Sequence, residues 1–160
     1  MRVLGIDPGT RVCGYGVIDA DGPRIRPVRS GTVRSKSSVL ARRLKVLYDG
    51  LIEVIEESDP DVAAVEGAFY GTNARTAIKI GEGRGMVLLA VTTCGLEVHE
   101  YAPAMVKKAV AGTGRAQKSQ VQKMVARILG LNDLPTPHDA SDALAIAICH
   151  CHRMRIPGVK

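Results

Sequence analysis

Aromatic side chains are scarce in this chain of 160 residues, which has no tryptophan and a single phenylalanine, Phe69. No apolar run approaches the roughly 20 residues that a membrane-spanning helix needs. The N-terminus lacks the longer apolar region and cleavage site of a signal peptide, and the four cysteines show no secreted-scaffold spacing. We therefore expect a cytoplasmic protein with reduced thiols and no membrane contact.

The length allows one sizeable core and is too short for two ordinary domains. We expect a single domain over residues 1–152 and a short basic tail over residues 153–160. The run Cys149-His150-Cys151-His152 contains metal-ligating residue types. Alternate positions on a helix face different directions, however, and no second ligand pair lies at a useful spacing. A helix end is therefore preferred over a zinc site.

Acidic residues are absent between Pro103 and Asn132, in a chain whose formal net charge is +6. The cations of this segment are Lys107, Lys108, Arg115, Lys118, Lys123 and Arg127. A solvated helical face, the alternative interpretation, normally mixes both signs of charge. A one-signed stretch of this length favours a nucleic acid as the partner.

The apolar periodicity predicts an α/β fold. Strands are expected over residues 2–6, 12–18, 26–33, 62–66 and 96–101, and helices over 39–58 and 73–93 and from 104, 119 and 136. The first three strands form an antiparallel meander, and Ser37 or Ser38 caps the first helix. The later strand–helix–strand alternation places neighbouring strands parallel, which gives a mixed sheet.

Four carboxylates occupy unusual positions. Asp7 follows the apolar run from Val3 to Ile6, Glu66 follows a second such run, and Asp139 and Asp142 precede an apolar helix. The carboxyl ends of neighbouring parallel strands form the functional edge of such sheets. Buried carboxylates need compensating charge, and a divalent cation supplies it where no Lys or Arg is near in sequence. The pattern predicts a metal site.

Asp139 has a second interpretation. Thr136 as N-cap, with Pro137 at the first helical position, would make Asp139 the third residue of a capping box. The spacing from Asp139 to Asp142 also lets one turn of helix offer two carboxylates to the same cation. Capping leaves Asp142 unexplained, so a metal-binding role is favoured for both.

The ordered set of motifs resembles the RuvC family of Holliday-junction resolvases, in the RNase H-like superfamily, over nearly the whole chain. The motifs are Gly5-Ile6-Asp7-Pro8-Gly9-Thr10, Glu66 with the Phe69-containing loop, Gly81-Glu82-Gly83-Arg84-Gly85, Lys118-Ser119-Gln120-Val121-Gln122 and Asp139-Ala140-Ser141-Asp142-Ala143-Leu144-Ala145. The resemblance implies a single domain with an RNase H-like mixed five-stranded sheet flanked by helices. It also implies a homodimeric endonuclease that nicks opposed strands of a four-way DNA junction symmetrically, beside the RuvA-RuvB branch-migration complex.

The resemblance assigns roles to several residues. Asp7, Glu66, Asp139 and Asp142 would bind two Mg²⁺ ions, for which Mn²⁺ can substitute, and would produce 5′-phosphate and 3′-hydroxyl ends. Lys118 would stabilise negative charge at the scissile phosphate. Some family members have His at the third acidic position, but the spacing to Asp142 selects Asp139 and leaves His138 beside the site or on the surface.

The resemblance also implies contacts with DNA. They are Phe69, Tyr70, Arg75, Arg84, Lys107 and Lys118. A lone Phe normally lies in a core, but the position of Phe69 in a glycine-bounded loop favours stacking on an unpaired base. Tyr70 could instead pack on its own loop, and Arg75 and Arg84 could be plain surface charges.

Two rival functions remain at this point. The segment from Gly5 to Thr10 also resembles the phosphate loop of actin-like and sugar-kinase ATPases, but those proteins need a second, similar domain for which this chain has no room. The other rival is a protein that binds branched DNA without cutting it. Four clustered acids, which repel DNA, argue against a pure binding role.

Overall fold

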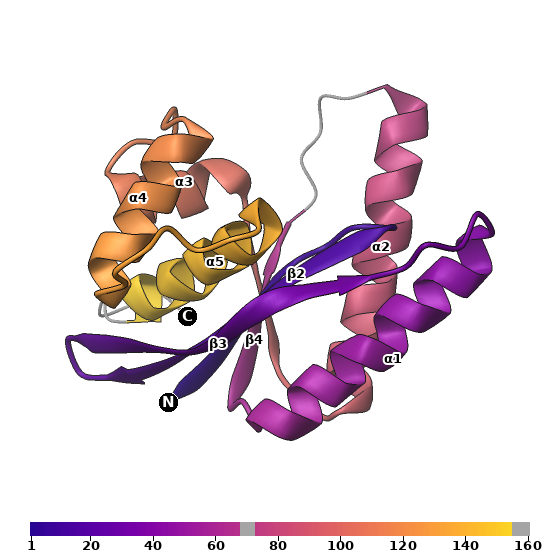
Figure 1. The fold of residues 1–160 in the computed structure, drawn as a ribbon, viewed down its shortest axis with the longest axis horizontal. Helices are drawn as coiled ribbons and strands as arrows, with labels where there is room; N and C mark the ends of the chain where they lie inside the picture. Colours follow the sequence, from indigo (N-terminus) through magenta and orange to yellow (C-terminus); the bar gives the residue numbers. More distant parts are fainter. Residues whose placement is uncertain (68–72, 155–160) are drawn as a thin grey trace.

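A computed structural model describes residues 1–67 and 73–154 of the chain (Figure 1). Its elements are β1 (Arg2–Asp7), β2 (Val12–Asp21), β3 (Arg24–Arg34), α1 (Leu40–Ser58), β4 (Val62–Glu66), α2 (Ala74–Thr93), β5 (Val98–Tyr101), α3 (Pro103–Ala111), α4 (Lys118–Leu129) and α5 (His138–Met154). This is the predicted order of strands and helices. Among the helices of these two ranges, none has both the length and the apolar character required to span a bilayer.

The five strands form one mixed sheet in the order β3-β2-β1-β4-β5. The β1–β2 and β2–β3 pairs are antiparallel, which confirms the predicted meander. The β1–β4 and β4–β5 pairs are parallel, and Ile6 of β1 lies opposite Val65 of β4. Asp7 and Glu66 therefore end neighbouring strands at the same edge of the sheet, as predicted.

Helices cover both faces of the sheet, with α1 and α2 on one side and α3, α4 and α5 on the other (Figure 1). Ile6 and Val65 belong to the core beneath α1 and α2. Because side chains alternate between the two faces of a strand, the next residues, Asp7 and Glu66, point toward the face covered by α5. The alternation thus aims both carboxylates at the helix that carries Asp139 and Asp142.

Three glycines let α5 pack directly on the backbone of β1 and β2. A Cβ atom at Gly5 would overlap the carbonyl oxygen of Ala143, and one at Gly14 would overlap that of Asp139. A Cβ atom at Gly16 would lie 2.8 Å from the side chain of Leu144. The absence of side chains at these positions sets the distance between α5 and the sheet, and therefore the position of its acids.

Both predicted serine and threonine caps are wrong. Helix α1 begins at Leu40 with Val39 as its N-cap and without a side-chain capping bond, because the hydroxyl of Ser37 bonds to the backbone of Val39 instead. Helix α5 begins at His138, and the first helical bonds end on the carbonyl of Pro137 rather than that of Thr136.

This start places Asp139 at the second helical position, so the capping box proposed from the sequence does not form. The fifth strand is also shorter than predicted, since it begins at Val98 rather than Leu96.

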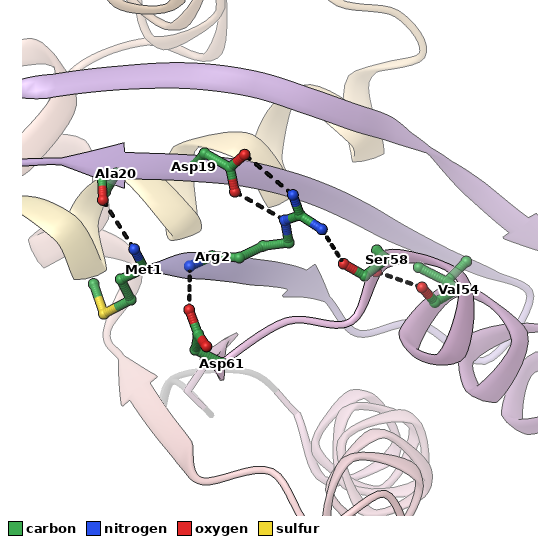
Figure 2. Close-up of polar contacts among 7 residues, drawn as sticks. All are labelled: Met1, Arg2, Asp19, Ala20, Val54, Ser58 and Asp61. Atoms are coloured by element: carbon green, nitrogen blue, oxygen red, sulfur yellow. Dashed lines mark hydrogen bonds and ion pairs between the residues drawn. The ribbon is translucent and has the colours of Figure 1, made fainter.

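A polar network fixes the opposite end of β1 (Figure 2). The guanidinium of Arg2 donates to both carboxylate oxygens of Asp19 at 2.8 and 3.2 Å and to the carbonyl of Ser58 at 2.7 Å. The backbone N–H of Arg2 donates to Asp61. The hydrogen bond from Arg2 holds the pKa of Asp19 below its ordinary value. The network ties β1 to β2 and to the end of α1, far from Asp7.

We expect Gly5→Ala to destabilise the protein by at least about 2 kcal/mol, because the new methyl group overlaps the backbone of α5 and overpacking carries costs of this size. Chemical denaturation followed by circular dichroism measures the free energy of unfolding. Gly67→Ala is the matched control, since its Cβ would meet its nearest neighbour at an ordinary 3.6 Å. Equal stability of the two variants would show that α5 can move away from the sheet.

Candidate active site

One cleft of about 220 Å³ opens at the carboxyl ends of β1 and β4. Asp7, Glu66 and Asp142 line it, from β1, β4 and α5 respectively. Lys107 of α3 and Lys118 of α4 line the same cleft. Three of the four carboxylates predicted to meet do so, together with the two lysines that the sequence singled out.

The cleft strongly disfavours the ionised form of Asp7. Burial raises its pKa from 3.8 to about 7, and the charges of Glu66, Asp142 and Asp139 act in the same direction. Lys118 opposes the rise without cancelling it. Burial and the three neighbouring acids therefore outweigh Lys118, which favours the charged form of Asp7.

The other two carboxylates of the cleft differ in their partners. Burial raises the pKa of Glu66, with a further contribution from Asp142, against opposing effects of Lys118 and Lys107. Lys118 donates from Nζ to Oδ2 of Asp142 at 3.1 Å, and this hydrogen bond raises the pKa of the lysine. Asp142 thus has a hydrogen-bonded cationic partner. Glu66 is affected by the charges of Lys118 and Lys107 without a hydrogen bond to either.

Asp139 lies one helical turn before Asp142, outside the lining of the cleft. Its side chain is 43% exposed, and its Oδ2 lies 4.0 Å from Nη2 of Arg34 at the end of β3. Its charge still contributes to the raised pKa of Asp7. Asp139 therefore belongs to the same electrostatic cluster, while its side chain is directed toward a cation at the border.

The chemistry of this cluster fits a hard divalent cation, because carboxylate oxygens are the ligands that Mg²⁺ and Mn²⁺ prefer. Across residues 1–67 and 73–154, however, no three Asp, Glu, His or Cys side chains stand together as a complete ligand set. Lys118 lies 3.1 Å from Asp142 and Arg34 lies 4.0 Å from Asp139, so a cation bound to these acids would compete with both side chains. Small side-chain rotations would have to accompany metal binding.

The remaining predicted site residues have different surroundings. Arg75 is exposed in the first turn of α2, and His138 is exposed at the start of α5. Arg84 donates from Nη2 to both carboxylate oxygens of Glu100, at 2.6 and 2.7 Å, so a contact with DNA would have to compete with this pair. Phe69 and Tyr70 lie outside the described residues.

Comparison with known proteins identifies the family. A family model for the crossover junction endodeoxyribonuclease RuvC matches residues 3–150. This chain belongs to the RuvC family. It is 54% identical over 153 residues to the RuvC of Bordetella parapertussis, which covers 95% of this chain and 84% of that protein. It is 48% identical over 157 residues to the RuvC of Desulfitobacterium hafniense, with 98% and 95% covered.

Solved structures of RuvC proteins support the same family assignment. The RuvC of Thermus thermophilus in complex with a Holliday junction substrate matches with a TM-score of 0.89 at 36% identity, over 97% of this chain and 95% of that chain. Another structure of Thermus thermophilus RuvC gives a TM-score of 0.86, with 97% and 96% covered. The likeness confirms the predicted single-domain RNase H-like fold, with its mixed five-stranded sheet flanked by helices.

Two partners of predicted site residues were not expected from the sequence: Arg34 beside Asp139, and Glu100 beside Arg84. Arg34 follows Val33, which packs in the α1 and α2 core, so alternation along β3 would have placed the arginine on the face of α5. No sequence signal pairs Glu100 with Arg84, because that contact depends on how α2 packs beside β5.

We expect Asp7→Asn to stabilise the metal-free protein at pH 8. A pKa of about 7 in place of 3.8 corresponds to a cost on the order of 4 kcal/mol for the ionised carboxylate, which the amide does not incur. For the unsubstituted chain, this group makes stability fall as pH rises from about 4 through 7 and then level off, since the folded state holds the proton longer than the unfolded state.

Melting temperatures at pH 5 and pH 8 in EDTA measure this effect. Asp7→Asn should gain several degrees at pH 8 and much less at pH 5. The exposed Asp133→Asn is the control and should follow the unsubstituted protein at both pH values. An equal gain at the two pH values would attribute the effect to packing rather than to charge.

Proposed function

We propose that this chain is a Holliday-junction resolvase, a metal-dependent endonuclease that makes symmetric paired nicks in opposed strands of four-way DNA junctions during recombination and repair. The observation that carries the proposal is the meeting of Asp7, Glu66 and Asp142 with Lys107 and Lys118 in one cleft. Membership of the RuvC family supports it. The products are 5′-phosphate and 3′-hydroxyl ends.

Asp7, Glu66, Asp139 and Asp142 are the residues that would hold two Mg²⁺ ions, with Mn²⁺ as a substitute. Their fit rests on the hard oxygen donors and on the raised pKa of Asp7, which burial and then the neighbouring acids produce and which a bound cation would oppose. Two such ions, if bound by these acids, would supply an activated water molecule and charge stabilisation for the leaving 3′ oxygen. Lys118, at the edge of the acids, stabilises negative charge on the scissile phosphate.

The basic and aromatic residues bind the junction. Lys107 and Lys118 line the cleft and hold backbone phosphates beside the acids. Phe69 and Tyr70 stack on an unpaired base near the junction centre. Arg75 supplies a further phosphate contact from α2, and Arg84 does so by exchanging Glu100 for a phosphate.

Two opposed nicks require two active sites, so we propose that the active form is a homodimer. An apolar groove of about 520 Å³ between α1 and α2 offers a surface for the second copy. Leu44, Tyr48, Met86 and Leu89 line it, and Leu89 is 59% exposed in the single chain. A contiguous apolar surface with an exposed leucine, such as this groove, is of the kind that marks protein interfaces.

Two further assignments rest on the family resemblance. The RuvA-RuvB branch-migration complex is the partner that presents the junction to this nuclease. The protein works in the cytoplasm, where it has access to recombining DNA.

Glu66→Gln should lower junction cleavage by at least about 100-fold while junction binding persists, because the change removes a metal ligand and leaves the basic surface intact. The assay uses an end-labelled synthetic four-way junction and a matched linear duplex, each with Mg²⁺ or Mn²⁺. Symmetric, ligatable nicks on the junction alone are expected from the unsubstituted protein. Tight junction binding without nicks under either metal would instead favour a structural DNA-binding role.

Leu89→Asp should convert the dimer to a monomer, because it places a charge in the proposed apolar interface. Sedimentation equilibrium at micromolar protein measures the change, and paired nicking should be lost with dimerisation. Glu56→Gln, on the exposed side of α1 away from this groove, is the control. An unchanged mass for Leu89→Asp would place the dimer contact elsewhere.

A further inference from the structure

Arg34, the last residue of β3, lies at the border of the acidic cluster and was not among the residues that the sequence suggested. It pairs in register with Val12, at the start of β2. Its neighbour Val33 packs in the core beneath α1 and α2, so Arg34 and Thr32 point to the opposite face, which α5 covers. The face of the sheet that carries Asp7 therefore also carries Arg34.

The strand register brings this face of β3 close to the acids. Asp7 lies opposite Gly14, and Gly14 lies opposite Thr32, so the three residues form a row across β1, β2 and β3. The backbone of Asp139 rests on Gly14, in the middle of that row. Arg34, two residues beyond Thr32, thus reaches Asp139 from the β3 side of the site.

The contacts of Arg34 are few and exposed. Its Nη2 lies 4.0 Å from Oδ2 of Asp139, and its Nε donates to Oγ1 of Thr32 at 3.0 Å. The side chain is 54% exposed. Lys118 is the counterpart on the α4 side, 3.1 Å from Asp142 and 74% exposed. Each of the two acids on α5 therefore carries one solvent-accessible cation, and the two cations come from opposite sides of the site.

Such exposed ion pairs are weak, with typical contributions of about 0–1 kcal/mol. A divalent cation bound to the carboxylate of Asp139 would carry twice the charge of the Arg34 guanidinium. It would neutralise this carboxylate and so remove the partner of Arg34. The guanidinium would then need another anion. A DNA strand that crosses the cleft brings phosphates to this position, and guanidinium groups bind phosphates in a bidentate manner.

We propose that Arg34 is a DNA-backbone contact at the active site, opposite Lys118, and that it pairs with Asp139 only while the metal is absent. A metal held by Asp139 would leave the guanidinium of Arg34 available for a phosphate, so that the arginine and the metal would compete for one carboxylate and both would favour DNA binding. This inference rests on the proposed function in one respect, the role of Asp139 as a metal ligand.

The first test measures junction affinity with all four acids intact and with Ca²⁺ in place of Mg²⁺, because Ca²⁺ also takes carboxylate oxygen ligands and the readout is binding rather than cleavage. Arg34→Ala should weaken binding about tenfold at 0.1 M salt and lower the slope of log affinity against log salt by about one. Arg24→Ala, at the other end of the same strand and roughly 30 Å away, is the matched control and should change neither quantity. Equal behaviour of the two arginine variants would overturn the proposal.

The second test measures Mn²⁺ binding to the DNA-free protein by electron paramagnetic resonance. Arg34→Ala should bind Mn²⁺ about two- to fivefold more tightly, since a competing cation has been removed. Unchanged or weaker binding would overturn the proposed competition. Arg34→Gln, which retains a donor for Thr32 and removes the charge, should reproduce both results if the alanine variant proves unstable.

Asp139→Asn separates this inference from the proposed function. If Asp139→Asn binds Mn²⁺ as well as the unsubstituted protein does, the assigned metal site is wrong and the inference about Arg34 falls with it. If Asp139→Asn loses Mn²⁺ affinity while Arg34→Ala matches Arg24→Ala in junction affinity and the unsubstituted protein in Mn²⁺ affinity, only the inference about Arg34 fails.

Discussion

The contact between α5 and the glycines of β1 and β2 determines the rest of the site. Gly5, Gly14 and Gly16 have no side chain, so the helix lies directly on the backbone of the strands. Its two acids thereby come within electrostatic range of Asp7. A larger residue at any of these positions would separate the helix from the sheet, and the strand and helix acids would no longer share one cluster.

This close packing brings like charges together, and the fold tolerates them in two ways. Asp7 is protonated in roughly half of the molecules at pH 7, because burial and the neighbouring acids raise its pKa to about 7. The acids of α5 instead hold cations from other elements, Asp142 with Lys118 and Asp139 with Arg34. Protonation lowers the negative charge at the buried Asp7, and ion pairs with exposed cations compensate the charges of Asp139 and Asp142. Only exposed ion pairs can exchange partners at low cost.

Much of this architecture could be predicted because it follows from local patterns. Apolar periodicity gave the order of elements, and the parallel pairing of β1 with β4 placed Asp7 and Glu66 at one edge. The caps of α1 and α5 were mispredicted. A hydroxyl near a helix start can bond to several neighbouring backbone groups, and a proline there is compatible with more than one starting residue of the helix. The Arg34–Asp139 pair could not be predicted, since it depends on how closely α5 approaches Gly14.

The distribution of cations also separates the acids into two groups by their partners. Asp7 and Glu66 end buried strands and, among the described residues, accept no hydrogen bond from a Lys or Arg, so their positions are fixed by the sheet. Asp139 and Asp142 hold long, exposed cations that lose little when they leave. If these pairs were buried, breaking them would cost several kcal/mol, and the cations would be tied to the protein. The proposed roles of Lys118 and Arg34 need this exposure, because a cation that leaves its carboxylate at low cost is available to bind a phosphate.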